Sequence, residues 1–206
     1  MSDPIPEGST RERLLAAAMA LFTDRGYAGT SVREIVEAAG LTKPALYYHF
    51  GSKEGVYRAL VDELERLFDA GLAANLTPHG TARERLERLL LGLWGLFEVH
   101  QEAVRFINAA FWGPAQGAPA FDIESFHTKL RGAVEGIVGD GLAAGELAAA
   151  EARDVAHALI ALFAFSMDLT LAHPELGPGR FGLERALDLL FRGLAASAER
   201  PLENPS

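Results

Sequence analysis

The sequence predicts an all-α protein in which a three-helix helix-turn-helix head is joined to a larger helical body, with about nine helices in total. Apolar residues recur at the i, i+3, i+4, i+7 spacing of a helix face, and no stretch alternates convincingly as a strand does. Glycines, prolines and capping residues separate the periodic stretches. With 206 residues, 49% of them hydrophobic, the chain can bury a sizeable core in both parts.

The first two expected helices each begin at a Ser-x-x-Glu capping box and end at a glycine. The box at 9–12 precedes a helix that Gly26 stops. The box at 31–34 opens a helix that ends at Gly40, because a glycine accepts the left-handed conformation of a sharp turn. Two helices joined by such a turn are typical of a helix-turn-helix, which we expect at residues 31–50.

The third helix is expected from Lys43 to about Phe50, with Thr42 as its N-cap and Pro44 in its first turn, where a missing amide hydrogen costs nothing. Leu46 and Phe50 lie one turn apart and are expected to point inward. The outer face is then small, aromatic and cationic, on a helix short enough to lie in a DNA major groove, and consists of Lys43, Pro44, Ala45, Tyr48 and His49.

Further helices are expected along the rest of the chain. Ser52 caps the fourth and Thr81 the fifth. The loop GPAQGAP at 113–119 and the breaker HPELGPG at 173–179 separate later helices. The expected ranges are about 53–75, 82–100, 102–112, 120–139, 152–172 and 182–198.

Residues 8–68, with the segments TRERLLAAAMALFTDRGYAGTSV and EIVEAAGLTKPALYYHFGSKEGVY, resemble the TetR family of bacterial transcriptional regulators. The resemblance implies a DNA-binding domain at 8–68 and a helical ligand-binding and dimerisation domain at 69–206. It implies a cytoplasmic, homodimeric regulator, most simply a repressor that a small, mostly apolar or aromatic effector releases from a palindromic operator of double-stranded DNA. Ala45 departs from the family pattern because it offers no hydrogen bond to a base.

Each candidate DNA contact has a structural alternative. Thr42 offers a hydroxyl and backbone amides to a phosphate, and it is also an N-cap. Tyr47 and His49 resemble family residues that hydrogen-bond phosphates, whereas Tyr47 could equally be half-buried packing. Lys53 matches the family's lysine that meets the DNA backbone, and its alternative is a solvated surface side chain. The candidate base contacts, any of which could be merely exposed, are Arg33, Lys43, Pro44, Ala45 and Tyr48.

The charge distribution is compatible with DNA binding although the formal net charge is -9. Residues 1–60 hold seven Lys or Arg and seven Asp or Glu, so the whole deficit lies in residues 61–206. Attraction between the head and DNA should therefore be modest and strongly dependent on salt.

The last two expected helices carry more apolar surface than packing on one neighbour requires. Either they are buried core helices, or they pair with their two-fold mates in a four-helix dimer interface, as the resemblance implies. A dimer also suits the head, because two heads about one helical turn apart can read a palindrome. The expected interface residues are Leu159, Phe163, Ser166, Leu187, Leu190, Phe191 and Leu194.

The middle of the chain is rich in large aromatic residues with few polar groups among them. Each of these residues could be ordinary core, but as a set they are compatible with a pocket for an apolar or aromatic effector. The histidines and asparagine of the set are expected to point inward. The candidate pocket residues are Trp94, Phe97, His100, Phe106, Asn108, Phe111, Trp112, Phe126, His127 and Phe163.

Enzymatic, metal-binding and membrane functions have little support in the sequence. No HExxH, GxSxG or GxxxxGK[ST] motif occurs, and the six histidines lack metal-binding spacing, so we expect no catalytic residue, metal or cofactor. The absence of cysteine excludes disulfides and suits a cytosol. The N-terminus MSDPIPEGST is unlike a signal peptide, and the apolar stretch 155–167 is too short to span a bilayer.

Two other functions stay open. An all-helical small-molecule carrier without specific DNA binding would keep the pocket but should lack the segment LTKPALYYHF. A DNA-binding regulator without an effector would be supported by a collapsed interior.

Overall fold

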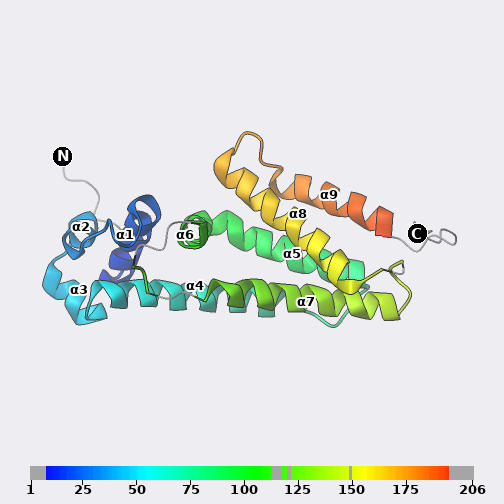
Figure 1. Cartoon of the computed structure of the whole chain (residues 1–206), viewed down its shortest axis with the longest axis horizontal. Helices are drawn as coiled ribbons and strands as arrows, with labels where there is room; N and C mark the ends of the chain where they lie inside the picture. Colours follow the sequence, from blue (N-terminus) through cyan, green and yellow to red (C-terminus); the bar gives the residue numbers. More distant parts are fainter. Residues whose placement is uncertain (1–7, 113–116, 120–121, 149, 195–206) are drawn as a thin grey trace. The chain divides into compact units, whose positions relative to one another are not determined.

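The structure is a computed structural model that describes residues 8–112, 117–119, 122–148 and 150–194. Within these residues the chain forms nine α-helices and no β-strand, which confirms the predicted all-α class (Figure 1). In chain order they are α1 (Thr10–Arg25), α2 (Val32–Ala38), α3 (Lys43–Phe50), α4 (Lys53–Asn75), α5 (Ala82–Val99), α6 (Gln101–Trp112), α7 (Ile123–Ala143), α8 (Ala152–Ala172) and α9 (Gly179–Leu194).

Most helix starts lie where the sequence predicted them, because a cap depends on neighbouring residues alone. The Ser9 and Ser31 side chains each accept a hydrogen bond from the backbone of the glutamate three residues later, and that glutamate's side chain accepts from the serine backbone. The Ser52 and Thr81 hydroxyls accept backbone N–H groups in the first turns of α4 and α5 in the same way.

Helix α7 continues beyond the predicted end near residue 139. Its residue Gly141 lies against the start of α5, and a Cβ added there would collide with the Cβ of Ala82. The helix ends at Ala143, and Gly145 then adopts a φ of 70°. The backbone N–H of Glu146 closes the end by donating to the Gly141 carbonyl over 2.9 Å. The predicted start near residue 120 lies outside the described residues.

Helix α9 begins earlier than predicted, inside the Gly- and Pro-rich breaker. The Gly182 N–H donates to the Pro178 carbonyl over 3.0 Å, so the first helical turn already forms at Gly179. Pro178 lies just ahead of the helix, where its missing N–H removes no helical hydrogen bond. The predicted end at 195–198 lies outside the described residues.

The described residues fall into two compact units. The first lies within residues 1–69 and 100–124 and contains α1, α2, α3, α6 and most of α4. The second lies within residues 70–99 and 125–206 and contains the end of α4 together with α5, α8, α9 and almost all of α7. Helix α6, which the sequence analysis assigned to the body, therefore groups with the helix-turn-helix.

The first unit is a small helical core built from one apolar face of each helix. In Figure 1, α1, α2 and α3 gather at the N-terminal end of α4. Leu14, Ile35, Leu46 and Val56, one from each of these helices, are fully buried. Helix α6 packs against α1, and its Phe106 ring lies 5.6 Å from that of Tyr57 on α4. The helix-turn-helix, formed by α2 and α3, is thus packed in one unit with α1, α6 and most of α4.

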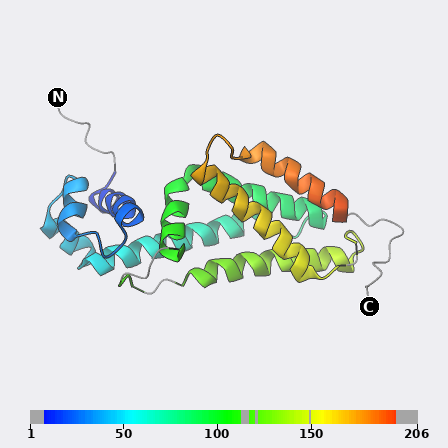
Figure 2. The ribbon, with the colours of Figure 1, turned by 45° about the horizontal axis from the view of Figure 1, so that its top comes forward.

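The second unit has a core of leucines between α5, α8 and α9. Figure 2 shows α8 and α9, in gold and orange, lying side by side as an antiparallel pair. Leu89 of α5, Leu159 of α8 and Leu187 of α9 are fully buried. An ion pair of 2.9 Å between Arg83 and Asp188 joins α5 to α9 at the edge of this core.

Helix α8 is longer than the apolar stretch recognised in the sequence. Its 21 residues, with a mean hydropathy of 1.8 in the most apolar window, are long and apolar enough to cross a membrane by length and composition. The prediction that this segment is too short is therefore wrong, because the helix extends beyond 155–167 on both sides. The core helix of a soluble protein passes the same test.

Candidate nucleic-acid interface

The turn before α3 is fixed by its backbone. Gly40 adopts a φ of 62°, and the Leu41 N–H donates to the Val36 carbonyl over 2.8 Å while the Gly40 N–H donates to the Glu37 carbonyl over 3.1 Å. This pair of bonds is a Schellman motif, which requires a left-handed residue at the glycine position. The predicted sharp turn is present, and it directs the chain into α3.

Helix α3 buries one face and exposes a continuous outer face. Leu46 is fully buried, whereas Tyr48 is 86% exposed and Tyr47 50% exposed. The Tyr48 and His49 rings meet edge to face at 5.1 Å. Lys43, Pro44 and His49 are also exposed, and Ala45 is partly exposed. The side chains that the sequence placed on the outer face therefore lie together at the surface of one short helix.

Thr42 occupies the N-cap position of α3, but its side chain makes no capping hydrogen bond. Its carbonyl oxygen instead accepts the N–H groups of Ala45 and Leu46 at 3.1 and 3.3 Å. The expectation of a hydroxyl cap is corrected here, because the exposed Thr42 side chain makes no hydrogen bond to the first-turn amides. An exposed hydroxyl at a helix N-terminus is well placed to donate to an anion.

Arg33 on α2 is already paired within its own helix. Its Nε donates to the Glu37 carboxylate over 2.6 Å, and this hydrogen bond raises the pKa of Arg33. Both side chains are largely exposed, so the ion pair is weak and Arg33 can leave Glu37 for another partner. Arg33 would have to leave Glu37 before it could contact a base or phosphate.

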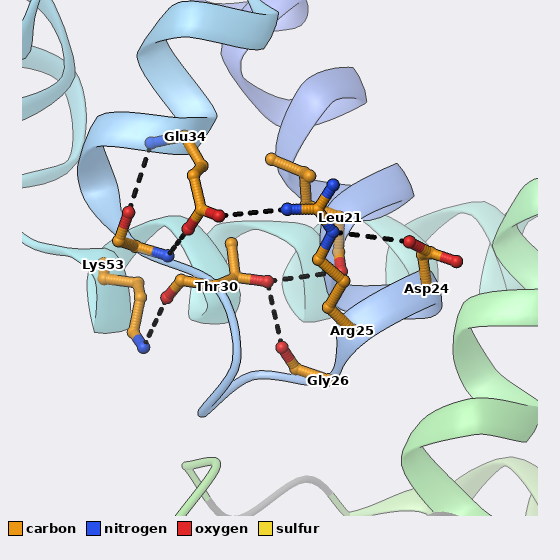
Figure 3. Close-up of polar contacts among 8 residues, drawn as sticks. Leu21, Asp24, Arg25, Gly26, Thr30, Glu34 and Lys53 are labelled. Carbon is orange, nitrogen blue, oxygen red and sulfur yellow. Dashed lines mark hydrogen bonds and ion pairs between the residues drawn. The ribbon is translucent and has the colours of Figure 1, made fainter.

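Lys53 lies in a different environment from the one that the sequence predicted. Its ammonium donates to the Thr30 carbonyl over 2.9 Å (Figure 3). It also donates to the Tyr27 carbonyl over 2.8 Å and lies 4.0 Å from the centre of the Tyr27 ring. Burial lowers the pKa of Lys53. Two of the three ammonium hydrogens are thus directed at the protein's own backbone, and the expected phosphate contact stays a prediction.

A polar network around this turn was only partly visible in the sequence. The buried Thr30 hydroxyl is hydrogen-bonded to the Leu21 and Gly26 carbonyls at 3.2 and 3.0 Å. Arg25 at the end of α1 donates to Glu34 over 3.0 Å, and Glu34 is the capping-box residue of α2. The capping box identified Glu34, but no local signal indicated the partners that α1 and α4 supply.

The candidate pocket residues are divided between the two units. The rings of Trp94, Phe97 and Phe163 pack together in the second unit, with centroids 5.0 and 6.4 Å from Trp94. Phe106 packs on Tyr57 in the first unit. Phe126 is buried and Asn108 is half-buried.

Two candidate pocket histidines differ from the prediction, and two aromatic side chains cannot be placed. His100 and His127, which were expected to point inward, are exposed. The side chains of Phe111 and Trp112 lie outside the described part of the structure.

The residues expected at the dimer interface are mostly inside one chain. Leu159, Phe163, Ser166, Leu187 and Phe191 are buried in the core of the second unit, and Leu190 and Leu194 are half-buried. The five buried side chains thus pack within their own chain, and contact of the seven residues with a partner stays a prediction. The exposed apolar residues of the same hairpin are Phe165, Leu176, Phe181 and Leu189.

The part of the chain that is most similar to known proteins is the head. The family model described as "Bacterial regulatory proteins, tetR family" matches residues 14–60. The HTH-type transcriptional activator FasR of Mycolicibacterium smegmatis is 32% identical over 103 residues, 50% of this chain and 47% of that protein. The HTH-type transcriptional repressor KstR2 of the same species is 38% identical over 107 residues, 52% of this chain and 48% of that protein. The chain thus spans about half the length of these curated relatives.

Solved structures resemble the chain over nearly its whole length. A bacterial regulatory protein of the tetR family from Rhodococcus RHA1 has a TM-score of 0.73 at 20% identity, covering 93% of this chain and 100% of that one. A gamma-butyrolactone receptor has a TM-score of 0.69 at 26% identity, covering 92% of this chain and 89% of that one. The head of the chain, residues 14–60, thus matches the tetR family of bacterial regulatory proteins, and the chain as a whole shares the all-helical fold of these solved structures.

Proposed function

We propose that this chain is a DNA-binding transcriptional regulator whose helix α3 enters the major groove. The observation that carries the proposal is the outer face of α3, where Lys43, Tyr48 and His49 are exposed while Leu46 anchors the helix in the core. An exposed cation beside aromatic hydroxyl and imidazole donors suits phosphate and base-edge contacts. We assign DNA binding to residues 8–68 and effector binding and dimerisation to residues 69–206, with α6 resting on the head.

We further propose that the regulator is a cytoplasmic homodimer that pairs through α8 and α9. Phe165, Phe181 and Leu189 are 66%, 74% and 69% exposed on these two helices. Large apolar side chains gathered on one helical hairpin are typical of a protein–protein contact. A two-fold dimer would present two α3 helices to half-sites about one helical turn apart, about 34 to 36 Å, and would thus read a palindrome.

The regulator is proposed to be a repressor that a small apolar or aromatic effector releases from DNA. The similarity to a gamma-butyrolactone receptor at 26% identity supports a receptor role for the body. The fully buried Trp94, packed on Phe97 and Phe163, makes the second unit rich in the aromatic surface that such ligands contact. Two conformers are enough for this mechanism, one that binds the operator and one that does not. An effector that binds the second conformer more tightly must weaken DNA binding.

The test is selection of duplexes from a random library by the purified chain, followed by fluorescence anisotropy on the selected sequence. We expect specific binding that Tyr48→Ala weakens by about 1 to 3 kcal/mol if Tyr48 reads a base edge. Tyr48→Phe removes only the hydroxyl, so it distinguishes the contribution of the hydroxyl to binding from that of the ring. Failure of the unaltered chain to enrich any sequence over random DNA would refute the proposal.

A further inference from the structure

Helix α1 contacts α4 near each of its own ends. Close to the C-terminal end of α1, the Phe22 ring lies 5.6 Å from the Tyr57 ring of α4, edge to face. Close to the N-terminal end, Arg11 donates from Nη1 to the Glu63 carboxylate of α4 over 3.1 Å. Arg11 and Phe22 are about 16 Å apart along the helix axis. Two contacts at this separation fix the angle between α1 and α4, whereas either contact alone would leave the angle free.

The two contacts differ in how strongly they depend on direction. Phe22 and Tyr57 are 3% and 4% exposed, and the burial of apolar surface that holds them together is not directional. The hydrogen bond between Arg11 and Glu63, in contrast, weakens steeply when the angle at its donor hydrogen changes. The two rings therefore form a joint that tolerates a change of angle, and the ion pair selects one angle.

Arg11 also contacts the end of α3. Its guanidinium lies 5.7 Å from the centre of the Phe50 ring, and the face of an aromatic ring attracts a cation. Phe50 is the last residue of α3, the helix that we propose to enter the major groove. Helix α4, which carries Glu63, continues into the second unit, to which we assign dimerisation. One side chain thus joins the DNA-reading helix to the helix that leads to the dimer.

We propose that Arg11 and Glu63 are positioning residues whose ion pair sets the angle of the helix-turn-helix against α4 and thereby the half-site spacing that the dimer accepts. The inference rests on the proposed function, because spacing matters only if two heads bind one duplex. The two side chains are 41% and 47% exposed, so their ion pair adds little to the stability of the fold. Such a pair can still shift the balance between two head orientations by up to about fivefold.

Duplexes with altered half-site spacing test the role in DNA binding. Inserting or removing a base pair between the half-sites changes their separation by about 3.4 Å and rotates one half-site about the duplex axis. The wild type should prefer the selected spacing, and Glu63→Gln and Arg11→Met should each reduce that preference about two- to fivefold. Glu63→Gln should leave the affinity for a duplex with a single half-site unchanged, because one head alone has no spacing to match.

Two further variants test whether the effect belongs to this ion pair. Glu54→Gln is the matched control, because Glu54 also accepts from an arginine, but its partner Arg58 lies in α4 itself. This variant should keep the wild-type spacing preference. The charge exchange of Arg11→Glu with Glu63→Arg should restore the preference that each single charge reversal reduces, since the ion pair is formed again in the opposite sense.

The angle between α1 and α4 can be measured without DNA. The chain has no cysteine, so spin labels attach only at introduced positions, here Ala20→Cys on α1 and Asp62→Cys on α4, both of which are exposed. Labelled chains diluted with unlabelled chains report the distance within one chain. The distribution of this distance should broaden in Glu63→Gln and in Arg11→Met and should keep its wild-type width in Glu54→Gln.

A wild-type distance distribution in Glu63→Gln would overturn the proposal, as would a wild-type spacing preference in that variant. If Arg11→Met lowers the slope of log affinity against log salt by about 0.9 while Glu63→Gln behaves as the wild type, Arg11 is instead a phosphate contact and the proposal fails. If the wild-type chain selects no duplex, the proposed function fails, and the spin-label distances still decide whether the ion pair sets the angle.

Discussion

The Arg13 guanidinium on α1 donates from Nη2 to the carbonyl oxygen of Ala39, the C-cap residue of α2, over 2.7 Å. A second, longer contact of 3.5 Å reaches the Gly40 carbonyl in the turn before α3. The last carbonyls of a helix lack helical partners and carry partial negative charge, so a guanidinium is a suitable donor there. Arg13 therefore joins α1 to the turn of the helix-turn-helix.

We expect Arg13→Met to lower the free energy of unfolding by about 1 to 3 kcal/mol, because a hydrogen bond from a charged donor to a backbone carbonyl is lost. Urea denaturation followed by circular dichroism measures the change. Arg33→Met is the matched control, since Arg33 pairs only with the exposed Glu37 among the contacts of the described residues, and should cost at most about 0.5 kcal/mol. Equal losses in both variants would show that the Ala39 contact carries no special weight.

Phe165→Glu should convert the proposed dimer into monomers. Phe165 is 66% exposed on α8, so the charge is accommodated in a lone chain but is left desolvated and unpaired in an apolar interface. Analytical ultracentrifugation reports the change, and circular dichroism should show unaltered helix content. Val99→Glu, at an apolar position on α5 that is 76% exposed, should leave the assembly unchanged. A Phe165→Glu protein that stays dimeric would move the interface away from this face of α8.

The head should lose stability in acid, because the stabilising contribution of the Glu34 carboxylate is lost there. Hydrogen bonding with Ser31, aided by Arg25, lowers the pKa of Glu34 below its ordinary value of 4.5. The carboxylate's contribution to stability is therefore fully present above pH 4.5 and is lost as pH falls through the lower, folded-state pKa. The difference in unfolding free energy between wild type and Glu34→Gln should shrink as pH falls from about 6 to about 3. A difference that stays constant over this range would contradict the linkage.

Effector binding and operator binding should weaken each other by the same factor. The fully buried Trp94 indole donates to Glu98 over 2.8 Å and is a natural reporter for ligands that enter the second unit. A small apolar compound that raises the melting temperature should lose about 5- to 150-fold in affinity when the selected duplex is present. Tryptophan fluorescence titrations with and without the duplex measure both affinities, and Trp94→Phe identifies the reporting residue. A compound with equal affinity in both titrations is not the effector.

Local features of the chain were predictable because they depend on residues a few positions apart. The boxes at 9–12 and 31–34, the glycine turn at 40 and the inward Leu46 were read from spacing alone and are present in the structure. The early start of α9 was not predictable, because Pro178 reads equally well as a loop residue and as the residue before a helix.

The sequence by itself determined the all-α class and the outer face of α3, since helix periodicity and caps are properties of neighbouring residues. The tertiary structure decided which contacts the charged and apolar side chains make. Lys53 was indistinguishable in sequence from a solvent-facing cation, and the turn at 27–30 that receives it lies more than 20 residues earlier. Phe163 and Phe165 read as one apolar stretch, yet one is 3% and the other 66% exposed. Periodicity defines the faces of a helix, and only packing against other helices selects which face is buried.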